Sequence, residues 1–346
     1  MKIRNFKNLG RFAGRFALTY LICYLMVGAI FLNLQGILPV ESRAALDFYE
    51  PYNLKAANLF AQFLLGAFLA LVLYPFYDLL FKGKHGLLIL FGALWGVALL
   101  GNLEPKPGSI EGLIYTQTTI LEHTLVVLAG AVQYLLLSLA LHRWEQFLGV
   151  SKRNGNLVGD SGCRQQDGNS PVLSQKMNVE KNKAFTSQAV ARTGVFSKWL
   201  KGYALRFTLI HLIIYLIVGS LFYEISGYQE ALTTMEAFEL WRPLESLGMV
   251  IALFFGQIGR GFFLALMLYG FYNIYMSRHN GWLLLFGLLF GLKVFPAIFT
   301  VPESLSIAIA EAAVGLPEII VQTLVFSLVF YAWEKRRSRK KEALAA

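Results

Sequence analysis

The chain consists largely of long apolar runs separated by short polar segments. Eight runs approach or exceed the roughly 17 residues that an α-helix needs to cross a bilayer core of about 30 Å. The predicted spans are 15–36, 58–80, 86–102, 119–142, 206–223, 248–276, 281–299 and 313–333. The run at 86–102 is the shortest, so a re-entrant segment there remains open as an alternative to a full span.

The sequence also contains an internal duplication. The segment RFALTYLICYLMVGAIF at 15–31 recurs as RFTLIHLIIYLIVGSLF at 206–222. Further equivalent pairs are Gln62 and Gln257, Tyr77 and Tyr272, Gly92 and Gly287, Gly96 and Gly291, Gln133 and Gln322, and Glu145 and Glu334. Because each copy has an even number of spans, both copies start on the same side of the membrane. We therefore expect an all-α integral membrane protein whose eight transmembrane helices form two parallel tandem four-helix repeats.

The repeated pairs Gly92-x-x-x-Gly96 and Gly287-x-x-x-Gly291 lie in the third run of each copy. Small residues at this spacing allow the backbones of neighbouring helices to approach closely. The third helix of each repeat is therefore predicted to lie inside the bundle.

The polar segments divide the chain into four parts. Residues 1–146 form the first repeat with a basic N-terminal interfacial segment, and 196–334 form the second repeat. Between them, 147–195 is rich in Asn, Gly, Ser, Gln and Lys, which predicts a disordered polar cytoplasmic linker. Residues 335–346 form a basic cytoplasmic tail.

A basic amphipathic segment precedes the first span of each copy. Its apolar positions include Phe6 and Phe12 in the first copy, and Trp199 and Tyr203 in the second. Lys and Arg residues alternate with these positions in both segments. We expect both segments to lie on the anionic lipids of the inner leaflet.

Composition and charge agree with a membrane protein. Of 346 residues, 56% are hydrophobic and 15% are charged, and the mean hydropathy is +0.54. The net charge of +10 comes from basic residues scattered between apolar runs, which argues against nucleic acid as a partner.

The distribution of charge predicts the topology. Most Lys and Arg residues fall on the side of the N-terminus, the linker, the tail and the turns at 81–85 and 277–280, whereas most carboxylates fall on the other side. The positive-inside rule then places both termini in the cytoplasm of a multi-pass plasma membrane protein. A signal peptide at the N-terminus is the alternative, but the same segment recurs inside the chain.

Ionisable residues inside the predicted spans are the main candidates for function. Counted from the inner ends of their helices, Arg260 lies ~24 Å, Glu318 ~22 Å and Lys293 ~18 Å across the membrane. Charges at such depth are costly and generally face the bundle interior or a wet cavity, so we expect an Arg260–Glu318 pair that Lys293 joins. Alternatively, the pair only locks helices together, or Arg260 snorkels outward.

Polar residues on the outer side differ between the two copies. We hypothesise that Ser109 and Glu111 of the first copy and Arg242 and Arg260 of the second form one outward-facing ligand site between the repeats. Neutral drift in exposed loops is the alternative. The full candidate set is Arg260, Glu318, Lys293, Gln257, Gln322, Arg242, Glu239, Ser109 and Glu111.

Known catalytic signatures such as HExxH, GxSxG and the P-loop are missing from the sequence. The histidines are dispersed, and Cys23 and Cys163 lie in different parts of the chain, so we expect neither a metal nor a cofactor. The sequence slightly favours a carrier or binder of a small molecule, ion or lipid. A membrane enzyme that acts on a lipid-linked substrate through Glu111, Glu239 and Glu303, and a non-catalytic scaffold or assembly factor, remain open.

Overall fold

The computed structural model describes residues 6–37, 56–102, 105, 107–157, 174–234, 241–242, 246–298 and 305–345. These residues are almost entirely helical, and their one β contact is the isolated bridge between Thr116 and Trp241. The elements are α1 (Phe6–Ile37), α3 (Ala56–Leu73), η2 (Tyr74–Phe76), α4 (Tyr77–Lys82), α5 (Gly86–Phe91), η3 (Gly92–Leu100), α6 (Ile110–Tyr115), α7 (Ile120–Leu157), α8 (Ser174–Ile225), α9 (Tyr228–Thr234), α10 (Leu247–Leu268), η5 (Tyr269–Phe271), α11 (Tyr272–Met276), α12 (Gly281–Ile298) and α13 (Leu305–Ala345).

Within the described residues, six helices are long and apolar enough to cross a membrane. They are Asn8–Phe31, Ala56–Lys82, Ile120–Leu148, Trp199–Ile225, Leu247–Met276 and Val314–Lys340. Each overlaps one of the predicted spans. The runs predicted at 86–102 and 281–299 form the shorter apolar helices Gly86–Leu100 and Gly281–Val294.

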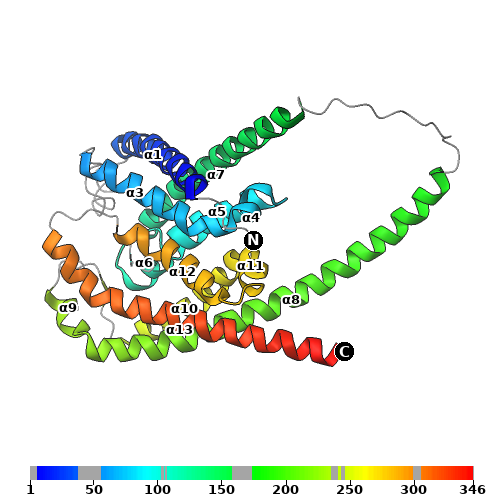
Figure 1. Cartoon of the computed structure of the whole chain (residues 1–346). Coiled ribbons are helices and arrows are strands. Elements are labelled where there is room, and N and C mark those ends of the chain that lie inside the picture. The colour runs from blue at the N-terminus through cyan, green and yellow to red at the C-terminus, as the bar shows by residue number, and fades with distance from the viewer. Residues whose placement is uncertain are drawn as a thin grey trace.

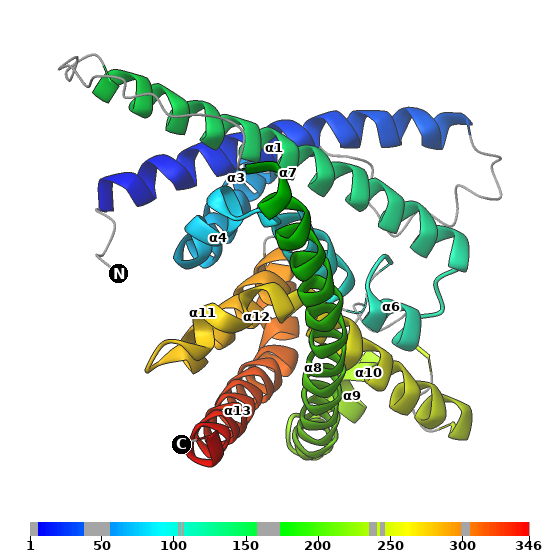
Figure 2. The same cartoon turned by 90° about the vertical axis from the view of Figure 1, so that its right-hand side faces the viewer.

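The helices fall into two groups. In the N-terminal half (α1 to α7), α1 packs against α3 and α7, and in the C-terminal half (α8 to α13), α8 packs against α10 and α13. The halves lie above and below each other in Figures 1 and 2. Between them, α12 contacts α3 and η3, and η3 also contacts α10. The two short apolar helices therefore connect the halves.

Two glycines allow this close packing. A side-chain carbon at Gly96 would lie 2.5 Å from the sulfur of Met267 on α10, and one at Gly291 would overlap Val72 on α3. The third apolar helix of each half thus packs against the second helix of the other half, as the glycine spacing predicted. By contrast, Gly287 has no atom within 4 Å of such a carbon.

Short 3₁₀ turns interrupt the second long helix of each half. Pro75 occupies the turn η2, where its missing N–H breaks the α-helical hydrogen-bond ladder, and Gly270 occupies the equivalent turn η5. Phe76 and Phe271 follow these two residues, and their rings contact each other edge to face with centroids 4.9 Å apart.

At the end of the bundle that carries Lys82 and Arg278, which we call the basic end, the two halves make the same polar contacts. Arg15 on α1 pairs with Glu145 on α7, with 2.5 Å between Nη2 and Oε1, and Tyr77 donates its hydroxyl to the same carboxylate. In the C-terminal half, the residues that make these contacts are Arg206, Glu334 and Tyr272.

In each basic amphipathic segment, one aromatic ring is buried in the core. Phe12 is 1% exposed and Tyr203 is 0% exposed, so their rings lie in the core instead of on a lipid surface. The ring of Phe12 contacts that of Tyr77 at the start of α4, and the ring of Tyr203 contacts that of Tyr272 at the start of α11.

Helices reach into both ends of the segment 147–195, since α7 extends to Leu157 and α8 begins at Ser174. The part from 174 onward contains neither Pro nor, before 194, Gly, and its Ala, Lys and Gln residues favour helices. Residues 158–173 lie outside the described residues. The tail from residue 335 continues as helix α13 to Ala345.

Candidate functional site

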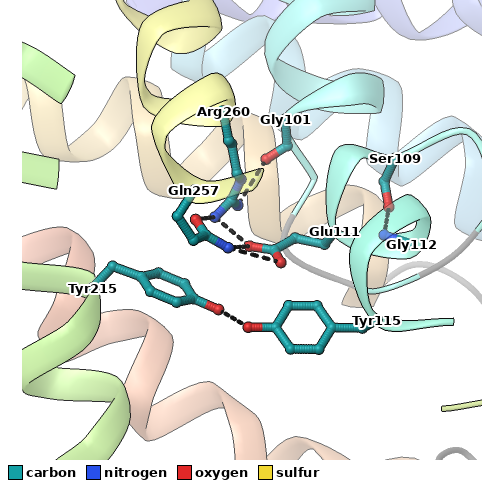
Figure 3. A network of polar contacts seen from close by, with 8 residues as sticks. All are labelled: Gly101, Ser109, Glu111, Gly112, Tyr115, Tyr215, Gln257 and Arg260. Atoms are coloured by element: carbon teal, nitrogen blue, oxygen red, sulfur yellow. Dashed lines mark hydrogen bonds and ion pairs between the residues drawn. The ribbon is translucent and has the colours of Figure 1, made fainter. Parts of the chain in front are cut away.

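A buried ion pair joins the two halves of the molecule. The guanidinium of Arg260 on α10 pairs with the carboxylate of Glu111 on α6 (Figure 3). Arg260 is 0% exposed and Glu111 is 2% exposed. Arg260 lies about 20 Å along α10 from Leu247 at the rise of an α-helix, so the pair lies near the middle of this helix.

Gln257 and a backbone carbonyl complete the surroundings of the pair. Gln257 donates from Nε2 to both oxygens of Glu111 at 3.2 Å and accepts from Arg260 Nη1 at 3.4 Å. Arg260 Nη2 donates to the carbonyl of Gly101, which follows η3, at 3.3 Å. The carboxylate and the carbonyl thus come from the N-terminal half, and the guanidinium and amide from the C-terminal half.

Local contacts fix the beginning of α6, which carries Glu111. Ser109 caps the helix, since its Oγ accepts from the Gly112 N–H at 2.8 Å. Gly108 has a φ of 86°, which favours glycine, and its N–H donates to His123 Nδ1 at 3.0 Å. Ser109, which we expected in a ligand site, therefore positions the helix that carries Glu111.

Further contacts hold the end of α6. The backbone N–H of Arg242 donates to the carbonyl of Tyr115 at 2.7 Å, and its Nη1 lies 3.5 Å from the carbonyl of Ile114. The hydroxyls of Tyr115 and Tyr215 on α8 are hydrogen-bonded to each other. Burial raises the pKa of Tyr115, so this phenol stays protonated at neutral pH.

A small cavity lies between α8, α10, α12 and α13, large enough for about one water molecule. Its polar lining consists of His211, Lys293, Gln322 and Thr323, all less than a tenth exposed. Its apolar lining consists of Phe207, Ile214, Leu264, Leu289 and Phe326.

Two polar atoms of the cavity lining lack hydrogen-bond partners among the described residues. Lys293 forms no ion pair within the described part of the chain, and Nε2 of both His211 and Gln322 has no hydrogen-bond partner there. The ring of His211 packs against Gly261, next to Arg260, and Lys293 lies within electrostatic reach of Arg260 and Glu111. The cavity and the ion pair are therefore neighbouring parts of one polar region, which we call the buried polar site.

The structure corrects the expected partner of Arg260, because the carboxylate that pairs with it is Glu111 and not Glu318. Helix depth gives the level of a side chain along the membrane normal but not the direction in which it points. Glu318 lies instead along α8, with Oε1 at 3.5 Å from the position of a side-chain carbon on Gly219. Glu239 lies outside the described residues.

For other members of the buried polar site, the sequence offered only a weak indication or no indication that they belong to it. The Gly101 carbonyl is a backbone group, so no residue type in the sequence indicates its role. His211 and Tyr215 belong to the duplicated segment, where Tyr20 and Tyr24 are their equivalents, so the change from Tyr20 to His211 was the available signal. Within the described residues, no three His, Cys, Asp or Glu side chains gather as metal ligands do.

Fold and site together define an α-helical membrane protein with charged side chains buried inside its helix bundle. No protein-family model, curated protein or solved structure matches the chain.

Proposed function

We propose that the chain is a carrier that binds a small polar solute or ion between its two halves. The observation that supports this most strongly is the Arg260–Glu111 pair, which is withdrawn from solvent and crosses from one half to the other. Ionisable residues at this depth are expensive, and in membrane proteins they commonly mark ion or substrate pathways.

The proposal includes two parallel four-helix repeats. The matching contacts of Arg15 with Glu145 and of Arg206 with Glu334 support it. The close approaches of Gly96 and Gly291 support it as well, since each connects a third helix with the second helix of the other half. Parallel repeats related by an axis along the membrane normal suit alternating access by rocking of one half against the other.

On this proposal, the helices Gly86–Leu100 and Gly281–Val294 are the third and seventh of eight spans. The outer end of the first of these helices lies inside the protein, where Gly101 and Asn102 are buried. We place both termini in the cytoplasm of the plasma membrane, since Lys82, Arg278 and Lys335 lie at the basic end. The starts of α1 and α12 and the end of α13 lie toward that end in Figure 2.

The unpaired groups of the cavity favour a carrier over a scaffold. A scaffold needs only helix contacts, and an apolar core supplies these at lower cost than buried ions. Here His211 and Gln322 each leave Nε2 without a hydrogen-bond partner in the described part of the chain, beside a cavity that Lys293 also lines. Such an arrangement is stable when a ligand or water supplies the partner.

Cysteine accessibility in sealed vesicles tests the proposal. In a background without Cys23 and Cys163, a Thr323→Cys variant places a thiol of similar size in the cavity lining. We expect an impermeant maleimide to react with it from one side of the membrane at a time. Ala98→Cys is the matched control, because Ala98 is the buried equivalent of Lys293 in the N-terminal half and is expected to remain unreactive.

The opposite result would favour a scaffold. If Thr323→Cys were unreactive from both sides while a cysteine at the exposed Ser277 was labelled, the cavity would have no path to water and the carrier proposal would fail.

A further inference from the structure

The polar lining of the cavity is made of hydrogen-bond donors and carries no carboxylate. The ammonium of Lys293 and the hydroxyl of Thr323 are donors, and the unpaired Nε2 of Gln322 is an amide donor. The unpaired Nε2 of His211 is a donor in one of the two neutral tautomers of the ring. From this lining we infer that the cavity is a binding site for a small monovalent anion of halide size.

The charge of the region supports this inference, which rests on the proposed function of a solute site. Arg260 and Glu111 balance each other through their ion pair, so the formal charge left over beside the cavity is that of Lys293. A buried ammonium without a counter-charge is costly. An anion in contact with Lys293 supplies that charge and accepts hydrogen bonds from the free donors.

The size of the cavity restricts the anion. Space for about one water molecule is too small for sulfate or gluconate, so the anions closest to it in size are monatomic ions such as chloride. The walls formed by Phe207, Leu264 and Phe326 are apolar, and a low local dielectric strengthens the attraction between the ammonium and the anion.

The N-terminal half lacks the equivalents of two of these donors, Lys293 and His211. Ala98 stands where the other half has Lys293, and Tyr20 stands where it has His211. The hydroxyl of Tyr20 is already used, since it donates to Gln62 at 3.3 Å. We therefore expect one anion site in each chain.

Thermal unfolding of the purified full-length protein in detergent tests the inference. In sodium gluconate, addition of sodium chloride is expected to raise the unfolding midpoint by several degrees and to saturate, as binding to the folded state alone requires. Sodium sulfate at matched ionic strength is expected to leave the midpoint unchanged. An equal rise with sulfate would overturn the inference, because general salt stabilisation would then explain it.

Two variants test whether the rise of the unfolding midpoint with chloride arises from binding in the cavity. Lys293→Met is expected to abolish the rise with chloride, and Gln322→Glu is expected to abolish it as well, because the new carboxylate takes the place of the anion. Gln133→Leu is the matched control at the equivalent position of the N-terminal half, and it is expected to retain the full rise. An undiminished rise in Gln322→Glu would overturn the inference even if Lys293→Met failed to fold.

The outcomes separate this inference from the proposed function. If Thr323→Cys reacts from solution but chloride has no effect, the carrier proposal stands and the anion inference fails. If chloride stabilises the protein through Lys293 while Thr323→Cys never reacts, the anion is a structural ligand. In that case the carrier proposal fails and the anion inference stands.

Discussion

The basic end of the bundle and its middle differ in how they use the duplicated positions. At the basic end, Arg15, Tyr77 and Glu145 make the contacts that their equivalents make in the other half. In the middle, the equivalent residues are unlike. Leu65 corresponds to Arg260, Ala98 to Lys293, and Tyr20 to His211.

We interpret this difference as a separation of helix packing from the proposed binding site. Each half needs contacts that hold its four helices together, so the same residue types occur at the equivalent positions of both halves. A single site between the halves needs only one set of charges. The two cations without a charged equivalent, Arg260 and Lys293, both lie in the C-terminal half. The N-terminal half contributes Glu111 and the Gly101 carbonyl to the same site.

The largest expected effect comes from breaking the pair in the middle. Glu111→Leu leaves the buried guanidinium of Arg260 without its counter-charge, and we expect a loss of about 3–5 kcal/mol in the free energy of unfolding. The Glu111→Leu/Arg260→Leu double variant is expected to recover most of this loss, since neither charge is then left alone. Equilibrium unfolding of all three variants, including Arg260→Leu, measures the coupling.

Additive losses in that cycle would show that Arg260 and Glu111 do not stabilise each other. Leu65→Met is the control for the equivalent position in the N-terminal half. It conserves volume and is expected to cost less than about 1.5 kcal/mol.

The basic end should respond equally in both halves. Glu145→Gln and Glu334→Gln each weaken hydrogen bonds from an arginine and a tyrosine, and we expect each to cost about 1.5–3 kcal/mol. The two unfolding free energies should agree to within about 0.5 kcal/mol, as the uncertainty of such comparisons allows. A difference of more than this amount would mean that the two sets of contacts are not energetically equivalent.

The sequence predicted the long helices and the close approach of the third helices, because both leave periodic signals. Long apolar runs predict helices, and Gly96 and Gly291 recur at equivalent positions. The sequence also predicted that Glu111 and Arg260 belong to one ligand site, because each is a polar residue that the other copy lacks. It did not predict their direct pairing, because the direction of a side chain around its helix and the depth of α6 depend on tertiary packing.

Substitutions of the glycines in the third helices also test the comparison of the halves, with smaller expected effects on stability. Gly291→Ala is expected to cost about 1–3 kcal/mol, because its new methyl group meets the stiff side chain of Val72. Gly96→Ala should cost less, since Met267 is flexible and can move aside. Gly287→Ala meets nothing within 4 Å and is expected to be neutral or stabilising, by up to about 1 kcal/mol.

Unfolding free energies of these three variants check the order. If Gly287→Ala destabilised the protein as much as Gly291→Ala, the contact with Val72 would not be the cause of the loss.

The smallest expected effect compares two serine caps, one at the buried polar site and one away from it. Ser109 accepts from the Gly112 N–H at 2.8 Å, and Ser246 at the start of α10 accepts from the Met249 N–H at 3.1 Å. Either Ser→Ala change removes one cap hydrogen bond and is expected to cost about 1 kcal/mol.

Their effects on the site should differ, because only Ser109 lies two residues from Glu111 and fixes the turn that aims it at Arg260. The loss of unfolding free energy caused by Arg260→Leu should therefore be smaller in the Ser109→Ala background than in the unmodified protein. In the Ser246→Ala background, this loss should be unchanged. Equal costs in both backgrounds would mean that α6 holds Glu111 in place without its cap. The contacts of Arg242 with the end of the helix would then be sufficient to position the pair.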